Sequence, residues 1–207
     1  MAVPGCPTIC VCEVSGNARA MVVLPLSFPP SLSSLTDASP MNPFSTSYAQ
    51  VHRDLKSANV LLNEHFEPKL CDFGLALETR AGMLPSGATS CHGTVQWAAP
   101  EMLLGEGCSG ASDVFSLGII MAEMLSRRVP HATLSAPEVV MGVVRDGLRP
   151  AIPGGTSHAL AQIIQACWRT EPTERPAAID IHNQLMKLEQ DLKTNELADV
   201  LQLDTKE

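Results

Sequence analysis

The segment VHRDLKSANVLL, residues 51–62, is the part of this chain from which its fold can be inferred. Ten residues after its Asn-Val-Leu-Leu end comes Asp72-Phe-Gly74, and further on Ala99-Pro-Glu101. Each tripeptide alone would be a weak signal. Because the motifs occur together, in this order and at these spacings, they indicate one specific kind of protein.

The three motifs resemble the catalytic loop (H-R-D-L-K-x-x-N), the metal-binding turn (D-F-G) and the end of the activation segment (A-P-E) of protein kinases. The resemblance covers residues 51–192. It implies an α+β, protein-kinase-like fold, here a mostly helical C-lobe with a small β-ribbon and an absent or vestigial N-lobe. It also implies ATP and Mg²⁺ as cofactors and a protein as the substrate.

Composition sets broad limits. With 207 residues, 45% of them hydrophobic and 17% charged, the chain is expected to fold around one core. A whole kinase fold is larger, at roughly 250 residues or more by the resemblance, so part of it is expected to be missing. The net charge of -8 disfavours nucleic acid and anionic membranes as general partners.

The cysteines and the apolar segments suggest a cytoplasmic location. The seven cysteines are scattered and lack the spacing of a zinc site, so we expect reduced thiols. No run of about 18 apolar residues occurs, and no membrane span is expected.

The resemblance assigns chemical roles to residues of the first two motifs. Asp54 would be the catalytic base, which accepts the proton of the substrate hydroxyl, and Lys56 would steady the transferred phosphate. Asn59 and Asp72 would bind Mg²⁺ through oxygen atoms. Leu61 would form the floor of an adenine pocket.

Other residues are expected to support this site. His52 and Phe73 would stack between the lobes, and Gly74 completes the D-F-G turn; a metal-ligand role is the rival reading of His52. Glu101 would form a buried ion pair with Arg175.

Two further supports concern the backbone and the activation segment. Asp113 would accept backbone N–H groups of the catalytic loop. Arg53 would meet a phosphate on the activation segment. The hydroxyls available for such a modification are those of Ser86, Thr89 and Ser90, and an unmodified polar loop is the alternative.

The type of acceptor follows from two local patterns. The position of Lys56, two residues after the base, resembles that of a lysine in Ser/Thr kinases. Residues 93–101 and 166–176 resemble the corresponding segments of the tyrosine-kinase-like group of Ser/Thr kinases. In that group Thr94 hydrogen-bonds the catalytic Asp and Lys. Ala98 stands where the family usually has Met, which is a mild departure.

Hydrophobic periodicity predicts the elements after the catalytic loop. Short strands are expected over residues 60–62 and 69–71, and residues 72–101 are expected to be a mobile loop. Residues 112–125 are apolar on nearly all sides, which is typical of a buried central helix. Amphipathic helices are predicted over the ranges 137–144, 157–168 and 178–192, with a tail at 193–207.

Residues 1–50 form an irregular leader with few charges and many Pro and Ser residues. Two strands, 8–14 and 18–26, would make it a remnant of N-lobe strands and the hinge; an unrelated leader is the alternative. It contains no Gly-rich phosphate loop and no lysine. We therefore expect a Ser/Thr protein kinase sequence that is truncated and inactive alone; the alternative is a non-catalytic binding module whose exposed C-lobe face takes a partner.

Overall fold

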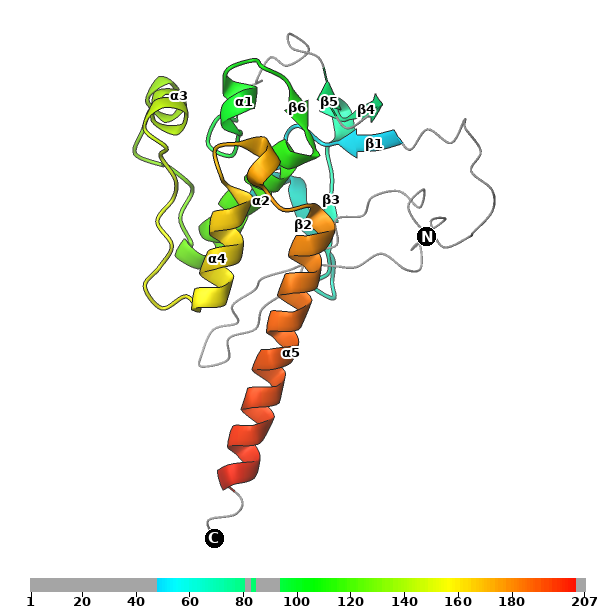
Figure 1. The fold of residues 1–207 in the computed structure, drawn as a ribbon, viewed down its shortest axis with the longest axis vertical. Helices are drawn as coiled ribbons and strands as arrows, with labels where there is room; N and C mark the ends of the chain where they lie inside the picture. The colour runs from blue at the N-terminus through cyan, green and yellow to red at the C-terminus, as the bar shows by residue number, and fades with distance from the viewer. Residues whose placement is uncertain (1–47, 81–82, 85–93, 204–207) are drawn as a thin grey trace, which may run out of the picture.

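The computed structural model describes residues 48–80, 83–84 and 94–203, and its centre is the helix α2, Gly110–Ser126 (Figure 1). Ser109 begins this helix by accepting the N–H of Ala111 at 3.2 Å, and the Ser112 hydroxyl accepts the N–H of Ser109 at 3.1 Å. The run from Val114 to Ala122 is buried without interruption. A helix that is apolar all round must be enclosed, and α2 is the element on which the others pack.

In the described part of the chain, four further α-helices surround α2. They are α1 (Pro100–Leu103), α3 (Ala136–Arg145), α4 (His158–Cys167) and α5 (Ala178–Leu203). The start of α3 is a capping box, because Glu138 accepts the N–H and the hydroxyl of Ser135 at 2.8 and 2.6 Å. The first half of α5 buries Ile181 and Leu185 against this core, and its second half extends away from it (Figure 1).

The strands form three two-stranded antiparallel sheets among the described residues. The pairs are β1 (Tyr48–Val51) with β4 (Leu77–Arg80), β2 (Val60–Leu62) with β3 (Pro68–Leu70), and β5 (Met83–Leu84) with β6 (Cys108–Ser109). Short 3₁₀ turns cover Ser57–Asn59, Phe73–Leu75 and Pro172–Glu174. The catalytic-loop segment thus runs from β1 to β2, directly against the start of α2.

The predicted fold class is confirmed, and the central helix and the three amphipathic helices lie where the sequence places them. The prediction of one unbroken loop over residues 72–101 is wrong for its described part, which contains β4, β5 and the start of α1. The strands β4 and β5 pair with β1 and β6, which are distant in sequence, so a local pattern could not reveal them. The helix α5 continues to Leu203, past the expected start of the tail.

Several expectations fall outside the described residues. The strands predicted in the leader and the candidate phosphorylation sites Ser86, Thr89 and Ser90 are among them. Within the described residues, none of the helices combines the length and apolar character that a membrane span needs.

The close approach of α2 and α4 depends on Gly118. A Cβ atom at this position would lie 2.8 Å from the Cβ atom of Cys167 and 3.4 Å from the carbonyl oxygen of Ile164. Both atoms belong to the rigid part of α4, so they cannot move away as a flexible side chain would. The absence of a side chain at residue 118 therefore sets the distance between the two helices.

Replacing Gly118 by Ala is expected to destabilise the fold by about 1–3 kcal/mol, because overpacking outweighs the gain of about 1 kcal/mol in helix propensity. The matched control is Gly110→Ala, in the same helix, where a Cβ atom would meet nothing within 4 Å. Urea unfolding followed by tryptophan fluorescence measures both. Equal stabilisation by the two substitutions would contradict this account of the α2–α4 contact.

Candidate active site

The backbone of the catalytic loop is held by one carboxylate of α2. Asp113 accepts the N–H of His52 at 2.7 Å and the N–H of Arg53 at 3.0 Å. Arg53 has a φ of 71°, a left-handed conformation that is costly for a residue with a side chain. Two hydrogen bonds to one buried carboxylate hold this turn in place. Burial raises the pKa of Asp113, although the two N–H groups act in the opposite direction.

Asp54, Lys56, Asn59 and Thr94 form a single connected group. The Lys56 ammonium donates to Asp54 Oδ2 at 2.6 Å and to Thr94 Oγ1 at 3.0 Å. The Asn59 amide nitrogen donates to the Asp54 carbonyl oxygen at 2.8 Å and to Asp54 Oδ2 at 3.3 Å. Because these acceptors can only face the NH₂ end of the amide, the side-chain oxygen of Asn59 points to the other side, where it can accept or ligate.

The ring of His52 contacts the ring of Phe73, with centroids 4.9 Å apart and an interplanar angle of 59°. Its Nε2 lies 3.0 Å from the carbonyl oxygen of Cys71, which requires a proton on Nε2. Its Nδ1 accepts the N–H of Asp54 at 3.4 Å. With both ring nitrogens engaged, the geometry argues against the metal-ligand reading of this histidine.

The D-F-G turn exposes its carboxylate. Asp72 adopts a left-handed conformation with φ of 61° and is exposed. A Cβ atom at Gly74 would lie 3.3 Å from Asp72 Oδ1, closer than an ordinary contact, so glycine leaves room for this carboxylate. Among the described residues, no group of three or more His, Cys, Asp and Glu side chains could hold a metal ion.

Two apolar side chains beside the loop are open to solvent. Leu61, on β2, is 54% exposed, and Phe73 is 48% exposed. Arg53, in contrast, is half-buried and donates through Nη1 to the carbonyl oxygen of Leu75 at 3.1 Å. The arginine therefore lies against the segment that follows the D-F-G motif.

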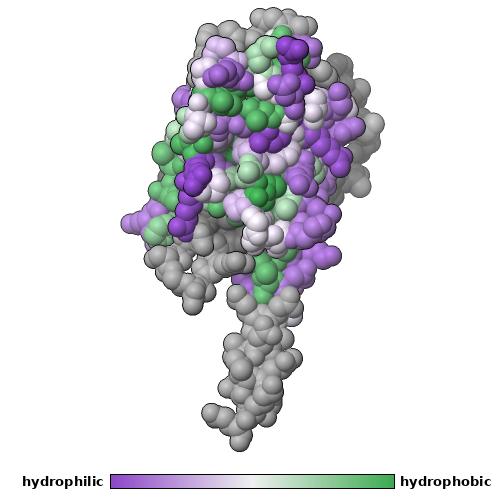
Figure 2. All heavy atoms as spheres, turned by 90° about the vertical axis from the view of Figure 1, so that its left-hand side faces the viewer, coloured by the Kyte–Doolittle hydropathy of each residue, from purple (hydrophilic) through white to green (hydrophobic). Residues whose placement is uncertain are grey.

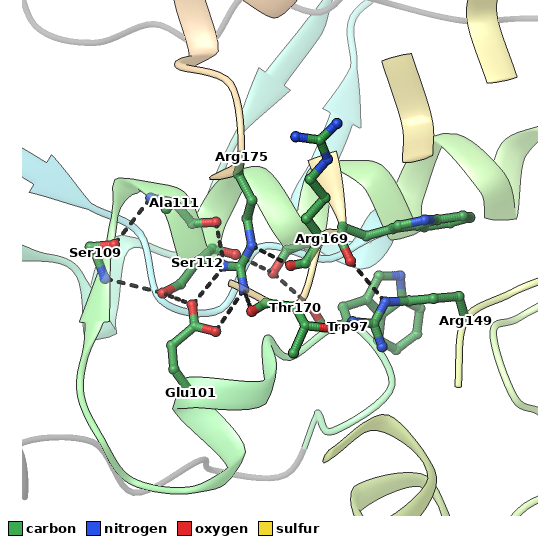
Figure 3. Close-up of polar contacts among 11 residues, drawn as sticks. Trp97, Glu101, Ser109, Ala111, Ser112, Arg149, Arg169, Thr170 and Arg175 are labelled. Carbon is green, nitrogen blue, oxygen red and sulfur yellow. Dashed lines mark hydrogen bonds and ion pairs between the residues drawn. The ribbon is translucent and has the colours of Figure 1, made fainter. Parts of the chain in front are cut away.

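Glu101 and Arg175 form the ion pair that the sequence analysis expects, with the Arg175 side chain fully buried (Figure 3). Arg175 donates to Glu101 Oε1 at 2.7 Å and to Oε2 at 2.8 Å. Three carbonyl oxygens, of Ala111, Arg169 and Thr170, accept its remaining N–H groups at 2.8–2.9 Å. All five guanidinium N–H groups have an acceptor, so the pair joins the A-P-E segment, the start of α2 and the chain before α5.

The electrostatics of this pair favour the charged form of Glu101. Burial alone would raise its pKa, but the hydrogen bonds and charge of Arg175 and a hydrogen bond from Ser112, at 2.7 Å, outweigh it. The pKa of Glu101 therefore lies below its ordinary value of 4.5. An Asp or Glu with a depressed pKa stabilises the folded state above its unfolded pKa and loses this contribution on acidification.

We expect the free energy of unfolding to fall as the pH decreases from about 4.5 through the lower, folded-state pKa of Glu101. Urea unfolding at a series of acidic pH values, for the wild type and Glu101→Gln, measures this contribution. Asp113 titrates in both proteins, so the difference between them isolates Glu101. Glu106→Gln, an exposed neighbour, serves as the control. A wild-type curve parallel to that of Glu101→Gln would refute the prediction.

One residue of the site was missed in the sequence. Glu123, on α2, accepts the Ser57 hydroxyl at 3.0 Å and the Trp97 indole N–H at 2.8 Å. The signal was available, because Glu123 is the only charged residue between Asp113 and Arg127 in an otherwise apolar helix. An isolated carboxylate there calls for polar partners.

Comparison with known proteins gives one family. The model described as protein tyrosine and serine/threonine kinase matches residues 38–185. Serine/threonine-protein kinase STY17 of Arabidopsis thaliana is 38% identical over 141 residues, which cover 66% of this chain and 24% of the relative.

Two other relatives give the same result. Serine/threonine-protein kinase CTR1 of Arabidopsis thaliana is 38% identical over 138 residues, with 67% of this chain and 17% of the relative covered. Stress-activated protein kinase alpha of Dictyostelium discoideum is 33% identical over 156 residues, with 70% and 24% covered. The chain thus spans less than a quarter of the length of these relatives.

Proposed function

Because the chain belongs to the protein tyrosine and serine/threonine kinase family, we propose that residues 51–192 are the catalytic C-lobe of a Ser/Thr protein kinase. The observation that carries this proposal is the contact of the Lys56 ammonium with both Asp54 (2.6 Å) and Thr94 (3.0 Å). In this arrangement Asp54 accepts the proton of the substrate hydroxyl. Lys56 sits beside it as the cation for the transferred phosphate.

The donor set fits Mg²⁺ and the phosphates of ATP. Mg²⁺ prefers oxygen ligands, keeps several waters and takes only one or two protein carboxylates together with phosphate oxygens. Asp72 supplies an exposed carboxylate, and Asn59 has a side-chain oxygen directed away from Asp54. When bound, the metal would neutralise phosphate charge. Leu61, with its exposed side chain, would lie against the adenine.

A preference for Ser and Thr hydroxyls is supported by Thr94 and Lys56. Their hydrogen bond ties the segment before the A-P-E motif to Lys56, which also donates to Asp54. Relatives named serine/threonine-protein kinases are in agreement with this choice of acceptor. The protein substrate itself is a Ser- or Thr-containing polypeptide.

The polypeptide of 207 residues is expected to be inactive alone. Phosphoryl transfer in this family uses a Gly-rich loop over the phosphates and a lysine on the α- and β-phosphates. Residues 1–50 contain neither, and their only basic residue is Arg19. A chain without these two parts would keep the catalytic loop and lack half of the nucleotide site.

The test combines the chain with a nucleotide lobe. A fusion of the N-lobe of STY17 to Tyr48–Glu207 of this chain is expected to phosphorylate Ser and Thr peptides with MgATP and to leave a matched Tyr peptide unmodified. The 207-residue chain without the added lobe should transfer no phosphate. A folded fusion that transfers nothing, or that modifies the Tyr peptide equally well, would refute the proposed function.

Regulation by phosphorylation is a further part of the proposal. Arg53 lies against the segment after the D-F-G motif, through its bond to the carbonyl oxygen of Leu75. A phosphate on Ser86, Thr89 or Ser90 would add a dianion that an arginine at this place can bind. Mass spectrometry of the protein from its natural source would identify the modified hydroxyl.

A non-catalytic binding module is the second candidate, favoured by the apolar side chains on the exposed C-lobe face. Leu61, Leu62 and Phe73 are 54%, 49% and 48% exposed. Such a surface suits a protein partner. The fusion test separates the two candidates, because a pure binding module transfers no phosphate.

The free cysteines Cys71, Cys108 and Cys167 support a reducing compartment such as the cytoplasm.

A further inference from the structure

The carboxylate of Glu123 connects two segments that are distant in sequence. Oε1 accepts the hydroxyl of Ser57 at 3.0 Å, and Oε2 accepts the indole N–H of Trp97 at 2.8 Å. Ser57 lies 66 residues before Glu123, and Trp97 lies 26 residues before it. Each oxygen therefore holds a different part of the chain against α2.

Each of the two connected segments carries residues of the candidate catalytic group. Ser57 directly follows Lys56 in the loop that carries Asp54. Trp97 lies three residues after Thr94, which contacts Lys56. The Trp97 carbonyl oxygen also accepts the hydroxyl of Ser116, on α2, at 2.8 Å. The segment 94–99 is thus fixed to the central helix at Trp97 and to the catalytic loop at Thr94.

A carboxylate suits this bridge because both partners can donate to it. An ionised Glu accepts hydrogen bonds at both oxygens, whereas Gln accepts at one and donates at the other. A glutamine could keep both bonds by turning its NH₂ group toward the Ser57 hydroxyl, which can accept, so an apolar side chain of similar length, Met, is the change that removes the bridge. The desolvation cost of a half-buried charge in an apolar helix is offset by the two charge-assisted bonds.

We propose that Glu123 is a positioning residue that sets the distance between the catalytic loop and the segment 94–99, between which the acceptor hydroxyl would lie. It acts through Ser57 and Trp97 and does not itself touch the reacting atoms. The part of this proposal that concerns the acceptor hydroxyl, called the acceptor-side role below, rests on the proposed function. The bridge itself is a property of the folded chain and can be tested without any phosphate transfer.

The experiment uses the full 207-residue chain labelled with ¹⁵N. The indole N–H signal of Trp97 is assigned by its loss in Trp97→Phe, which leaves that of Trp168. In Glu123→Met, which removes both acceptor oxygens, the Trp97 indole signal is expected to shift and its exchange with solvent to become about tenfold faster. The backbone amide signals of Asp54 and Thr94 are expected to shift as well, because the two segments move relative to each other.

Two matched controls and one milder variant complete the design. Glu106→Met removes an exposed carboxylate, and Thr194→Ala removes an exposed hydroxyl of α5 that donates to the carbonyl oxygen of Gln190; neither should move these signals. Ser57→Ala removes one bond of the bridge and should shift the Trp97 and Thr94 signals even if Glu123→Met fails to fold.

The proposal is overturned if the Asp54 and Thr94 signals stay in place while the Trp97 indole signal moves. Glu123 would then hold one tryptophan and position nothing. It is also overturned if Ser57→Ala has no more effect than Thr194→Ala. Because no phosphate transfer is measured, these outcomes are independent of the fusion test, and a fusion without activity would remove only the acceptor-side role.

Discussion

Replacing Arg175 by Met is expected to lower the free energy of unfolding by about 3–5 kcal/mol, because it leaves the Glu101 carboxylate without its buried partner. The substitution also leaves carbonyl oxygens of Ala111, Arg169 and Thr170 without their donors. A domain of this size has a total stability of about 5–15 kcal/mol, so the loss is a large fraction of it. Urea unfolding monitored by tryptophan fluorescence measures the change.

The control and a conservative variant make this result specific. Arg128→Met, at an exposed arginine, is expected to change stability by no more than about 0.5 kcal/mol. Arg175→Lys keeps the charge, but an ammonium has three donors for the five acceptors around this site, so it should recover only part of the loss. If Arg175→Met and Arg128→Met were equally stable, the ion pair would not hold the A-P-E segment.

Replacing Asp54 by Asn in the fusion enzyme is expected to reduce kcat by about 10²–10⁴-fold. Asn has the same shape but cannot accept the proton of the substrate hydroxyl, and the ion pair with Lys56 at 2.6 Å is lost. The KM for ATP should change little, because Asp54 is not among the residues assigned to the metal or the adenine. Steady-state kinetics with a Ser peptide measures both constants.

The control for this change is Asp191→Asn, at an exposed aspartate on α5, which should keep the rate of the unmodified fusion. Circular dichroism would show that both variants remain folded. Retention of full activity in Asp54→Asn would remove Asp54 from the role of the base and would require another group to accept the proton.

The burial pattern of α3 shows why the sequence could locate core residues. Figure 2 displays the α3 side of the molecule, where hydrophobic residues occur in several groups separated by hydrophilic ones. On α3 itself, Val139 and Val143 are buried while Met141 is 48% exposed. The spacing of four residues between the two buried valines is the helical period, which a sequence displays directly.

The D-F-G to A-P-E segment was the least predictable part of the fold. Its strands β4 and β5 are only four and two residues long, and each pairs with a strand some 25–30 residues away in sequence. Short strands with distant partners have no periodic signal of their own, because their hydrogen bonds depend on what lies opposite. The composition of Gly, Ser and Thr there predicted a loop, and the pairing overrode it.

By itself, the sequence determined the family, the central helix and the group Asp54, Lys56 and Asn59, because these are local patterns of motif and period. The tertiary structure alone decided that Glu123 bridges Ser57 and Trp97. It also decided that Gly118 sets the α2–α4 distance, and that each of the five N–H groups of Arg175 has an acceptor. Such contacts join residues tens of positions apart. They depend on how the helices pack in space, which no local spacing in the sequence records.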